Sequence, residues 1–498
     1  MSLTHDSPLN IEQIERNFCE IAPALTEAEA IFESNRCLYC YDAPCTRACP
    51  THIDVPSFIK KIASGNLTGS ARVIFDANPI GATCARVCPV DVLCEGACVE
   101  KTLMAKPIEI GRLQRYATDA VMSRGRNVFK VGAGNDKTIG IVGSGPAGLS
   151  CATYLARLGY AVTIYERKSL PGGLDTYGMA EYKMSQVVSV EEAKMVERLG
   201  VEFKLNTKIG HDISFDQLQE KHDAVFLGVG LGATTRLNIP GEDLPGVYDA
   251  LDFIERIKTR EWLDVPIART VAVIGAGNTA IDVVTQARRL GAERVLMIYR
   301  RTEREMSAYK YEYELAKQDA VEFWWLTAPV EILADEKNRA AALRCVRMEF
   351  GEPDSTGRRS VQSVPNSEID IPCEMVIKAL GQKKMRELLG GISGVELDAV
   401  GCVVVNEHTM QTGNEKFFAG GDCVNGGREA VDAAQTGKLA AQGIHRFLFG
   451  EQVELAGARL PFVEKIAGEL PAAAPAAYDG PATPAVDLGV KSYGGPER

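Results

Sequence analysis

Two segments of this 498-residue chain combine a strand, a glycine-rich turn and a helix, and this combination restricts the fold most. Residues 138–145 are TIGIVGSG and residues 270–277 are TVAVIGAG, so that each apolar run, typical of a buried strand, leads into glycines. Such a turn places a pyrophosphate at a helix N-terminus, where free N–H groups and the helix dipole favour negative charge. The sequence therefore predicts an α/β protein with two Rossmann-like dinucleotide-binding domains.

The first motif contains every feature that this kind of site needs. Its first glycine allows the tight turn, the second lets the backbone approach a pyrophosphate, and the third lets the helix pack closely. The next strand-like run, AVTIYE, ends at Glu166, 23 residues after Gly143, and a carboxylate at that distance is suited to bind a ribose hydroxyl. The predicted binding residues of the motif itself are Gly143, Gly145, Pro146, Ala147 and Gly148.

The second motif differs at two points. Its predicted binding residues are Gly275, Gly277, Asn278, Thr279 and Ala280, where alanine replaces the third glycine. The following run, RVLMIYRR, ends at Arg300 and Arg301 with no acid at the ribose position. Arginine there can accommodate a 2′-phosphate and so favours NADPH over NADH. The acidic Glu303 and Glu305 would weaken such a site, and the arginines could equally lie in solvent, so that the nucleotide is either NADH or NADPH.

Eight of the fourteen cysteines lie between positions 37 and 98. They are Cys37, Cys40, Cys45, Cys49, Cys84, Cys88, Cys94 and Cys98. Disulfides are not expected in a reducing compartment, so the cluster indicates metal, and eight thiolates suffice for two 4Fe-4S clusters. Structural zinc is the alternative, but it favours two separated pairs rather than this denser pattern. The outlying Cys19, Cys151, Cys345, Cys373, Cys402 and Cys423 are interpreted as small buried hydrophobic residues.

Composition excludes several classes of function. The net charge of -11 argues against nucleic acid as a partner, because phosphate binding needs clustered lysine and arginine. No run of about 18 apolar residues predicts a membrane span, and the acidic start is unlike a secretory signal, so we expect a cytoplasmic protein. Residues 126–498 contain no Cys-x-x-Cys pair, which argues against a disulfide reductase.

The segments PGGL at 171–174 and AGGD at 419–422 resemble those of flavoproteins that bind two dinucleotides. In that group the aspartate contacts the ribityl or phosphate region of FAD. The resemblance assigns FAD to the first site, and the positions concerned are Gly173, Leu174, Gly421 and Asp422.

Over residues 30–450 the order of parts resembles two related groups: the small subunit of bacterial glutamate synthase, and the electron-entry part of dihydropyrimidine dehydrogenase. The segments 78–99 and 109–119 look more like the pyrimidine enzyme, in which one cluster has a glutamine ligand. The resemblance implies one cluster on Cys37, Cys40, Cys45 and Cys98 and another on Cys49, Cys88, Cys94 and Gln114. Cys84 would then be spare. Without the resemblance, Gln114 would be interpreted as a surface helix residue.

The same resemblance implies further contacts. The turn at Gly230 and Leu231 would line the flavin, and Asn278, Thr279, Ala379, Leu380 and Gly381 would line the nicotinamide nucleotide. An arginine that helps to hold the 2′-phosphate in NADPH-specific relatives falls near Ser307 here, which leaves room for NADH.

We therefore expect a helical iron–sulfur domain at 1–125, an FAD domain at 126–265 and 376–450, an NAD(P)H domain inserted at 266–375, and an extended tail at 451–498. The implied enzyme is an NAD(P)H-dependent oxidoreductase acting on CH–CH bonds. It would pass electrons through FAD and two 4Fe-4S clusters to an FMN-containing partner that reduces uracil or thymine. No catalytic acid or base is predicted. The alternatives are a glutamate synthase small subunit and a non-enzymatic scaffold or sensor.

Overall fold

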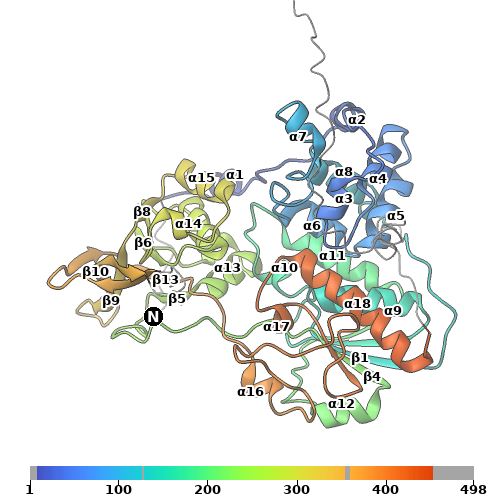
Figure 1. Cartoon of the computed structure of the whole chain (residues 1–498). Coiled ribbons are helices and arrows are strands. Elements are labelled where there is room, and N and C mark those ends of the chain that lie inside the picture. Colours follow the sequence, from blue (N-terminus) through green and yellow to red (C-terminus); the bar gives the residue numbers. More distant parts are fainter. Residues whose placement is uncertain (1–7, 126–127, 354–358, 452–498) are drawn as a thin grey trace, which may run out of the picture. The chain divides into compact units, whose positions relative to one another are not determined.

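The computed structural model describes residues 8–125, 128–353 and 359–451 (Figure 1). Its first part consists of short helices, as expected for the cysteine-rich region. They are α1 (Ile11–Asn17), α2 (Glu27–Asn35), α3 (Pro44–Ala48), α4 (Val55–Ala63), α5 (Leu67–Ala77), α6 (Gly81–Val87), α7 (Val99–Leu103) and α8 (Ile110–Met122). The Asp54 side chain caps α4 by accepting from the Ser57 amide at 3.1 Å. Buried Phe58, Ile74 and Leu113 pack α4, α5 and α8 into one core.

The first glycine motif lies in a parallel five-stranded sheet of order β14-β4-β1-β2-β3. Its strands are β1 (Thr138–Val142), β2 (Ala161–Tyr165), β3 (Glu202–Lys204), β4 (Ala224–Leu227) and β14 (Phe417–Ala419). Its helices are α9 (Pro146–Arg157), α10 (Leu174–Tyr177), α11 (Gln186–Glu197), α12 (Phe215–Lys221), α16 (Arg386–Leu389), α17 (Asp422–Asn425) and α18 (Ala430–Phe449). The long α18 packs directly on α9, so that both ends of this part of the chain meet at the motif (Figure 1).

The second motif lies in another parallel sheet, of order β5-β13-β6-β7-β8. Its strands are β5 (Val247–Asp249), β6 (Thr270–Ile274), β7 (Arg294–Ile298), β8 (Glu322–Trp324) and β13 (Met375–Lys378), with helices α13 (Ala250–Thr259), α14 (Asn278–Arg289), α15 (Lys310–Gln318), η1 (Trp262–Asp264) and η2 (Glu303–Glu305). These strands come from 247–378, a wider stretch than the predicted 266–375, because β5 pairs with β13. The whole stretch separates β4 from β14 in sequence, which is the inserted arrangement of the predicted fold class.

A smaller antiparallel sheet is added to the part of the chain that carries the second glycine motif, and it was not predicted. It contains β9 (Thr327–Ala334), β10 (Ala340–Pro353), β11 (Arg359–Ser363) and β12 (Ile369–Pro372). None of the described helices is both long and apolar enough to span a bilayer. The predicted extended tail lies almost entirely outside the described residues, which end at 451.

Candidate functional site

A cavity of about 450 Å³ opens where β1, β2 and β4 end. Eleven of the residues predicted for the first site line it: Gly143, Gly145, Pro146, Ala147, Glu166, Gly173, Leu174, Gly230, Leu231, Gly421 and Asp422. Gly143 has a φ of +97°, and a Cβ there would lie 2.4 Å from the carbonyl oxygen of Gly228. Gly148 does not line the cavity; a Cβ there would lie 2.0 Å from the Gly143 carbonyl oxygen, so this glycine lets α9 approach the turn.

Glu166 follows β2 directly and is almost fully buried, with 6% of its surface exposed. One carboxylate oxygen accepts from the Ser144 amide at 3.0 Å and the Ser144 hydroxyl at 2.6 Å. The other accepts from the Lys168 amide at 2.9 Å. These donors hold the carboxylate in one orientation in the wall of the cavity, where it was predicted to bind a ribose hydroxyl.

Asp175 lines the same cavity and was missed by the sequence analysis. It is 2% exposed, and its Oδ1 atom has no hydrogen-bond partner among the described residues. Burial raises the pKa of Asp175 well above its ordinary value, and the nearby Glu192 and Asp422 carboxylates raise it further. Its only sequence signal was its place beside Leu174.

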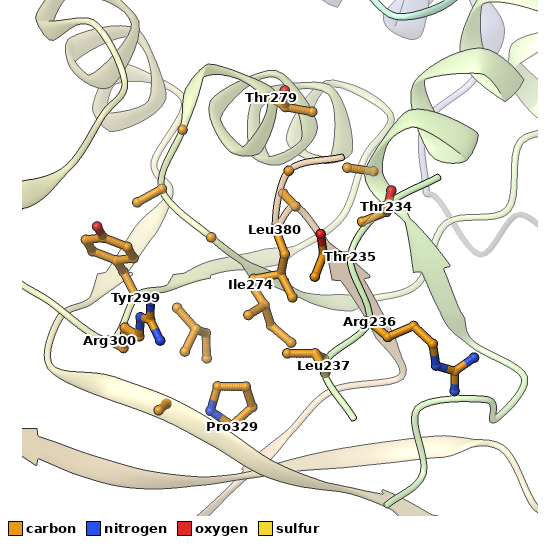
Figure 2. Close-up of a pocket in the computed structure, with 18 of the residues that line it drawn as sticks. Thr234, Thr235, Arg236, Leu237, Ile274, Thr279, Tyr299, Arg300, Pro329 and Leu380 are labelled. Carbon is orange, nitrogen blue, oxygen red and sulfur yellow. The ribbon is translucent and has the colours of Figure 1, made fainter. Parts of the chain in front are cut away.

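A second cavity, of about 670 Å³, opens at the carboxyl ends of β5, β6, β7 and β13 (Figure 2). It is lined by seven of the residues predicted for the nucleotide: Gly275, Gly277, Thr279, Arg300, Ala379, Leu380 and Gly381. Ser307 lines it as well. The opposite wall is the segment from Thr234 to Leu237, which the sequence analysis did not identify (Figure 2). Its signal would have been the short polar run that follows the Gly230 turn.

Three predicted nucleotide residues lie elsewhere. The Asn278 side-chain oxygen accepts from the Tyr309 amide at 3.0 Å. Ala280 is fully buried inside α14. Arg301 lines a separate cavity beside Trp325 and Phe350. Of the two neighbouring arginines, therefore, Arg300 alone faces the nucleotide cavity.

The two cavities are contiguous. Thr234, Leu251 and Gln382 line both of them, and Thr234 pairs with Gln382 through an isolated β-bridge. The two predicted dinucleotide sites therefore share a boundary.

The cysteines form two groups. Cys37, Cys40, Cys45 and Cys98 line one small apolar cavity. Burial raises the pKa of Cys45 to about 12, with further contributions from Cys98 and Cys37. Bound iron would offset this penalty, because a metal holds its thiol ligands deprotonated. The thiolate donor set therefore fits an iron–sulfur cluster.

The second group lies around the end of α6. The pKa of Cys88 is well above its ordinary value. The largest cause is a hydrogen bond with Cys84 and the next is burial, and the charges of Cys49 and Cys94 raise the pKa further. Gln114 is only 7% exposed and donates from its amide nitrogen to the Gly81 carbonyl at 2.7 Å, so that this bond does not use the amide oxygen, the atom that would bind iron in the predicted ligand set. The helix pattern alone would have made Gln114 a surface residue, whereas the structure buries it, and the resemblance had placed it among the cluster ligands.

Cys84, which the resemblance leaves without a cluster, lies in hydrogen-bond contact with Cys88. Its sulfur accepts from the Asn78 side chain at 3.1 Å. Within the described ranges, no three His, Cys, Asp or Glu side chains are placed to bind a single metal ion. Five of the six outlying cysteines are buried as predicted, whereas Cys19, just beyond the end of α1, is exposed.

Two family descriptions match the chain. Residues 137–437 match "Pyridine nucleotide-disulphide oxidoreductase". The chain belongs to this oxidoreductase family. Residues 14–126 match "Dihydropyrimidine dehydrogenase domain II, 4Fe-4S cluster". The oxidoreductase is thus an NAD(P)-dependent electron-transfer flavoprotein with a 4Fe-4S domain, as the sequence predicted.

Curated relatives span almost the whole of the described chain. The glutamate synthase [NADPH] small chain of Escherichia coli (strain K12) is 35% identical, covering 89% of this oxidoreductase and 96% of the relative. The NAD-dependent dihydropyrimidine dehydrogenase subunit PreT of the same organism is 33% identical, covering 86% and 97%. The solved structure of Mycobacterium tuberculosis FprA in complex with NADPH shares the fold, with a TM-score of 0.51 and 21% identity over 64% of this chain and 87% of that one.

Proposed function

We propose that this oxidoreductase is the electron-input subunit of a dihydropyrimidine dehydrogenase. It would take hydride from NADH or NADPH and pass single electrons through two 4Fe-4S clusters to an FMN-containing partner that reduces uracil or thymine. The observation that carries the proposal is the buried Gln114, held by Gly81 beside the Cys88 turn, in the segment that matches the dihydropyrimidine dehydrogenase domain. A neutral amide among thiolates is the ligand set that the resemblance implies.

The residues of the chain would orient the two dinucleotides. In the first cavity the N-terminus of α9 would hold a pyrophosphate and Glu166 a ribose hydroxyl. In the second cavity the N-terminus of α14 and Thr279 would hold the nucleotide, with Arg300 beside its adenosine ribose. FAD, when bound, supplies both the acceptor for hydride and the donor of single electrons. Thr234 and Gln382, at the shared boundary, would keep the two rings in register.

The exit for electrons would be the outer face of the cysteine domain. Four large apolar side chains in or just after α2 and α7, whose C-terminal ends Arg36 links through the Lys106 and Pro107 carbonyls, are strongly exposed: Phe32 at 71%, Leu38 at 52%, Leu103 at 63% and Met104 at 69%. Leu38 also lines the cavity of Cys37 and Cys40. Exposed apolar side chains gathered in one region mark a protein-binding surface, and we assign this one to the FMN-containing partner.

A glutamate synthase small subunit is the second candidate, because that relative is 35% identical over 96% of its own length. Anaerobic affinity purification from native cells separates the two candidates. An FMN-containing chain that co-purifies, together with uracil-dependent oxidation of NADH or NADPH, supports the proposal. A glutamine-hydrolysing synthase, or no response to uracil, contradicts it.

A matched pair of variants tests the exit surface. Phe32→Glu should abolish co-purification of the partner while NAD(P)H still bleaches the flavin of the purified chain. Val187→Glu changes another apolar residue, 65% exposed on α11, and should leave the complex intact. Loss of the partner in both variants, or in neither, would remove the assignment of this surface.

A further inference from the structure

A buried lysine of the flavin-binding part contacts the loop that carries one of the proposed cluster ligands. Lys438 lies on α18 and is 5% exposed. Its Nζ donates to the Thr51 carbonyl oxygen at 3.0 Å and lies 5.7 Å from the centroid of the Tyr154 ring. The Tyr154 hydroxyl in turn donates to the carbonyls of Asp76 and Ala77. The ammonium is therefore at the boundary between the two parts of the chain.

Thr51 connects this lysine to Cys49. The Thr51 hydroxyl lies 3.4 Å from the Cys49 sulfur, and the His52 amide closes the turn on the Cys49 carbonyl at 2.9 Å. Burial lowers the pKa of Lys438 to about 8, and the Cys49 thiolate raises it. A lysine with this pKa is protonated at neutral pH, so a positive charge lies within electrostatic range of the Cys49 sulfur.

We propose that Lys438 raises the reduction potential of the cluster held by Cys49, Cys88, Cys94 and Gln114, and so makes that cluster the better acceptor of electrons from the flavin. The inference rests on the proposed function for its assignment of the cluster. One electron moves from the reduced flavin to the cluster, and no bond is made or broken at Lys438. Reduction adds one negative charge to the cluster. A buried cation therefore stabilises the reduced cluster more strongly than the oxidised one.

Gln114 acts in the same direction from another side of the proposed cluster. A thiolate ligand would add a negative charge, whereas the amide adds none, so the net charge of the cluster is less negative. The first cysteine group has no amide of this kind, because its four predicted ligands are all cysteines. We therefore expect the second cluster to have the higher potential and to be the one that receives electrons from the flavin-binding part.

The test is an anaerobic redox titration of the full-length holoenzyme, followed by electron paramagnetic resonance. In Lys438→Met the midpoint potential of one cluster should become more negative by about 59 mV. For a one-electron couple, this is about a tenfold lower ratio of reduced to oxidised cluster at a fixed potential. The other cluster and the flavin should keep their midpoints. Lys438→Arg, which keeps the charge, should leave that cluster with a midpoint close to the wild-type value.

Two further variants separate charge from packing. Lys438→Gln removes the charge but can still donate to Thr51, so the midpoint potential of the cluster should shift as in Lys438→Met. This variant replaces Lys438→Met if the methionine form does not fold. Lys194→Met removes an exposed lysine that pairs with Glu191 on α11 at 2.7 Å and should shift nothing. Unchanged midpoints in both neutral variants, or an equal shift in Lys438→Arg, overturn the inference.

The titration uses neither uracil nor a partner, so its outcome is separate from that of the proposed function. A shift in Lys438→Met supports the inference even where uracil drives no oxidation. A wild-type enzyme with iron for one cluster alone would overturn both.

Discussion

The two dinucleotide sheets have the same strand order, but the chain supplies their outer strands in opposite ways. In each sheet the strand before the glycine turn is central, with its successor on one side and a later strand on the other. Beyond that later strand, the first sheet uses β14, which follows the insertion, whereas the second uses β5, which precedes its own motif. The local strand–turn–helix unit therefore determines the centre of each sheet, and the outer strand can come from either direction along the chain.

The two motifs differ more in chemistry than in shape. At the end of the second strand of each sheet, the first site has Glu166, held by three hydrogen bonds, and the second has Arg300, facing the nucleotide cavity. At the third glycine position the first site has Gly148 and the second has Ala280. A Cβ at Gly148 would lie 2.0 Å from a carbonyl oxygen, whereas Ala280 is accommodated fully buried. The first helix thus lies closer to its turn than the second.

The largest effect that this comparison predicts is for Gly148→Ala. The added methyl group cannot fit without moving α9 away from the Gly143 turn, so we expect the purified chain to contain little flavin and to lose about 3 kcal/mol of stability. The reverse change, Ala280→Gly, should cost only about 1 kcal/mol through helix propensity and keep nucleotide binding. Flavin content after desalting and thermal denaturation measure both. Equal flavin content and equal stability in the two variants would mean that α9 does not lie closer to its glycine turn than α14 does to its own.

A smaller effect is expected at the carboxylate of the first site. Glu166→Gln keeps the volume but removes the charge that accepts from Ser144 and Lys168, so flavin affinity should fall by about 10- to 100-fold, or about 1.4–2.7 kcal/mol. The matched control is Glu202→Gln on the neighbouring strand β3, where the side chain is exposed. Titration of the apoprotein with FAD measures both affinities. A normal affinity in Glu166→Gln would show that the carboxylate serves the turn and not the ligand.

The parts of this molecule that were predictable are those determined locally. The strand before each glycine turn follows from a short-range hydrophobic pattern, and the structure has these two strands as β1 and β6. The cysteine spacing likewise indicated a metal domain. The roles of individual cysteines came from resemblance, because spacing does not determine which thiols converge.

The features that were missed depend on distant residues. The outer strand β5 pairs with a segment more than a hundred residues away, and Thr234 reaches the nucleotide cavity only through that folding. The contact of Lys438 with Thr51 spans 387 positions. The burial of Gln114 could not be read from its helix pattern either, because that pattern does not show what packs against the polar face, and only the resemblance pointed to this residue. No periodicity in a sequence encodes such contacts.

The smallest predicted effect concerns the two adjacent arginines, which the sequence could not distinguish. Arg300 faces the nucleotide cavity and Arg301 lines another one, so the two should differ sharply when each is changed to glutamine. If the chain uses NADPH, Arg300→Gln should weaken its binding by about tenfold, or about 1.4 kcal/mol, and leave NADH unaffected, because only NADPH has the 2′-phosphate. Arg301→Gln should change neither. Affinities for both nucleotides, measured by flavin reduction under argon, test this. Equal values for the two nucleotides in the wild type and in Arg300→Gln would mean that Arg300 does not select between them.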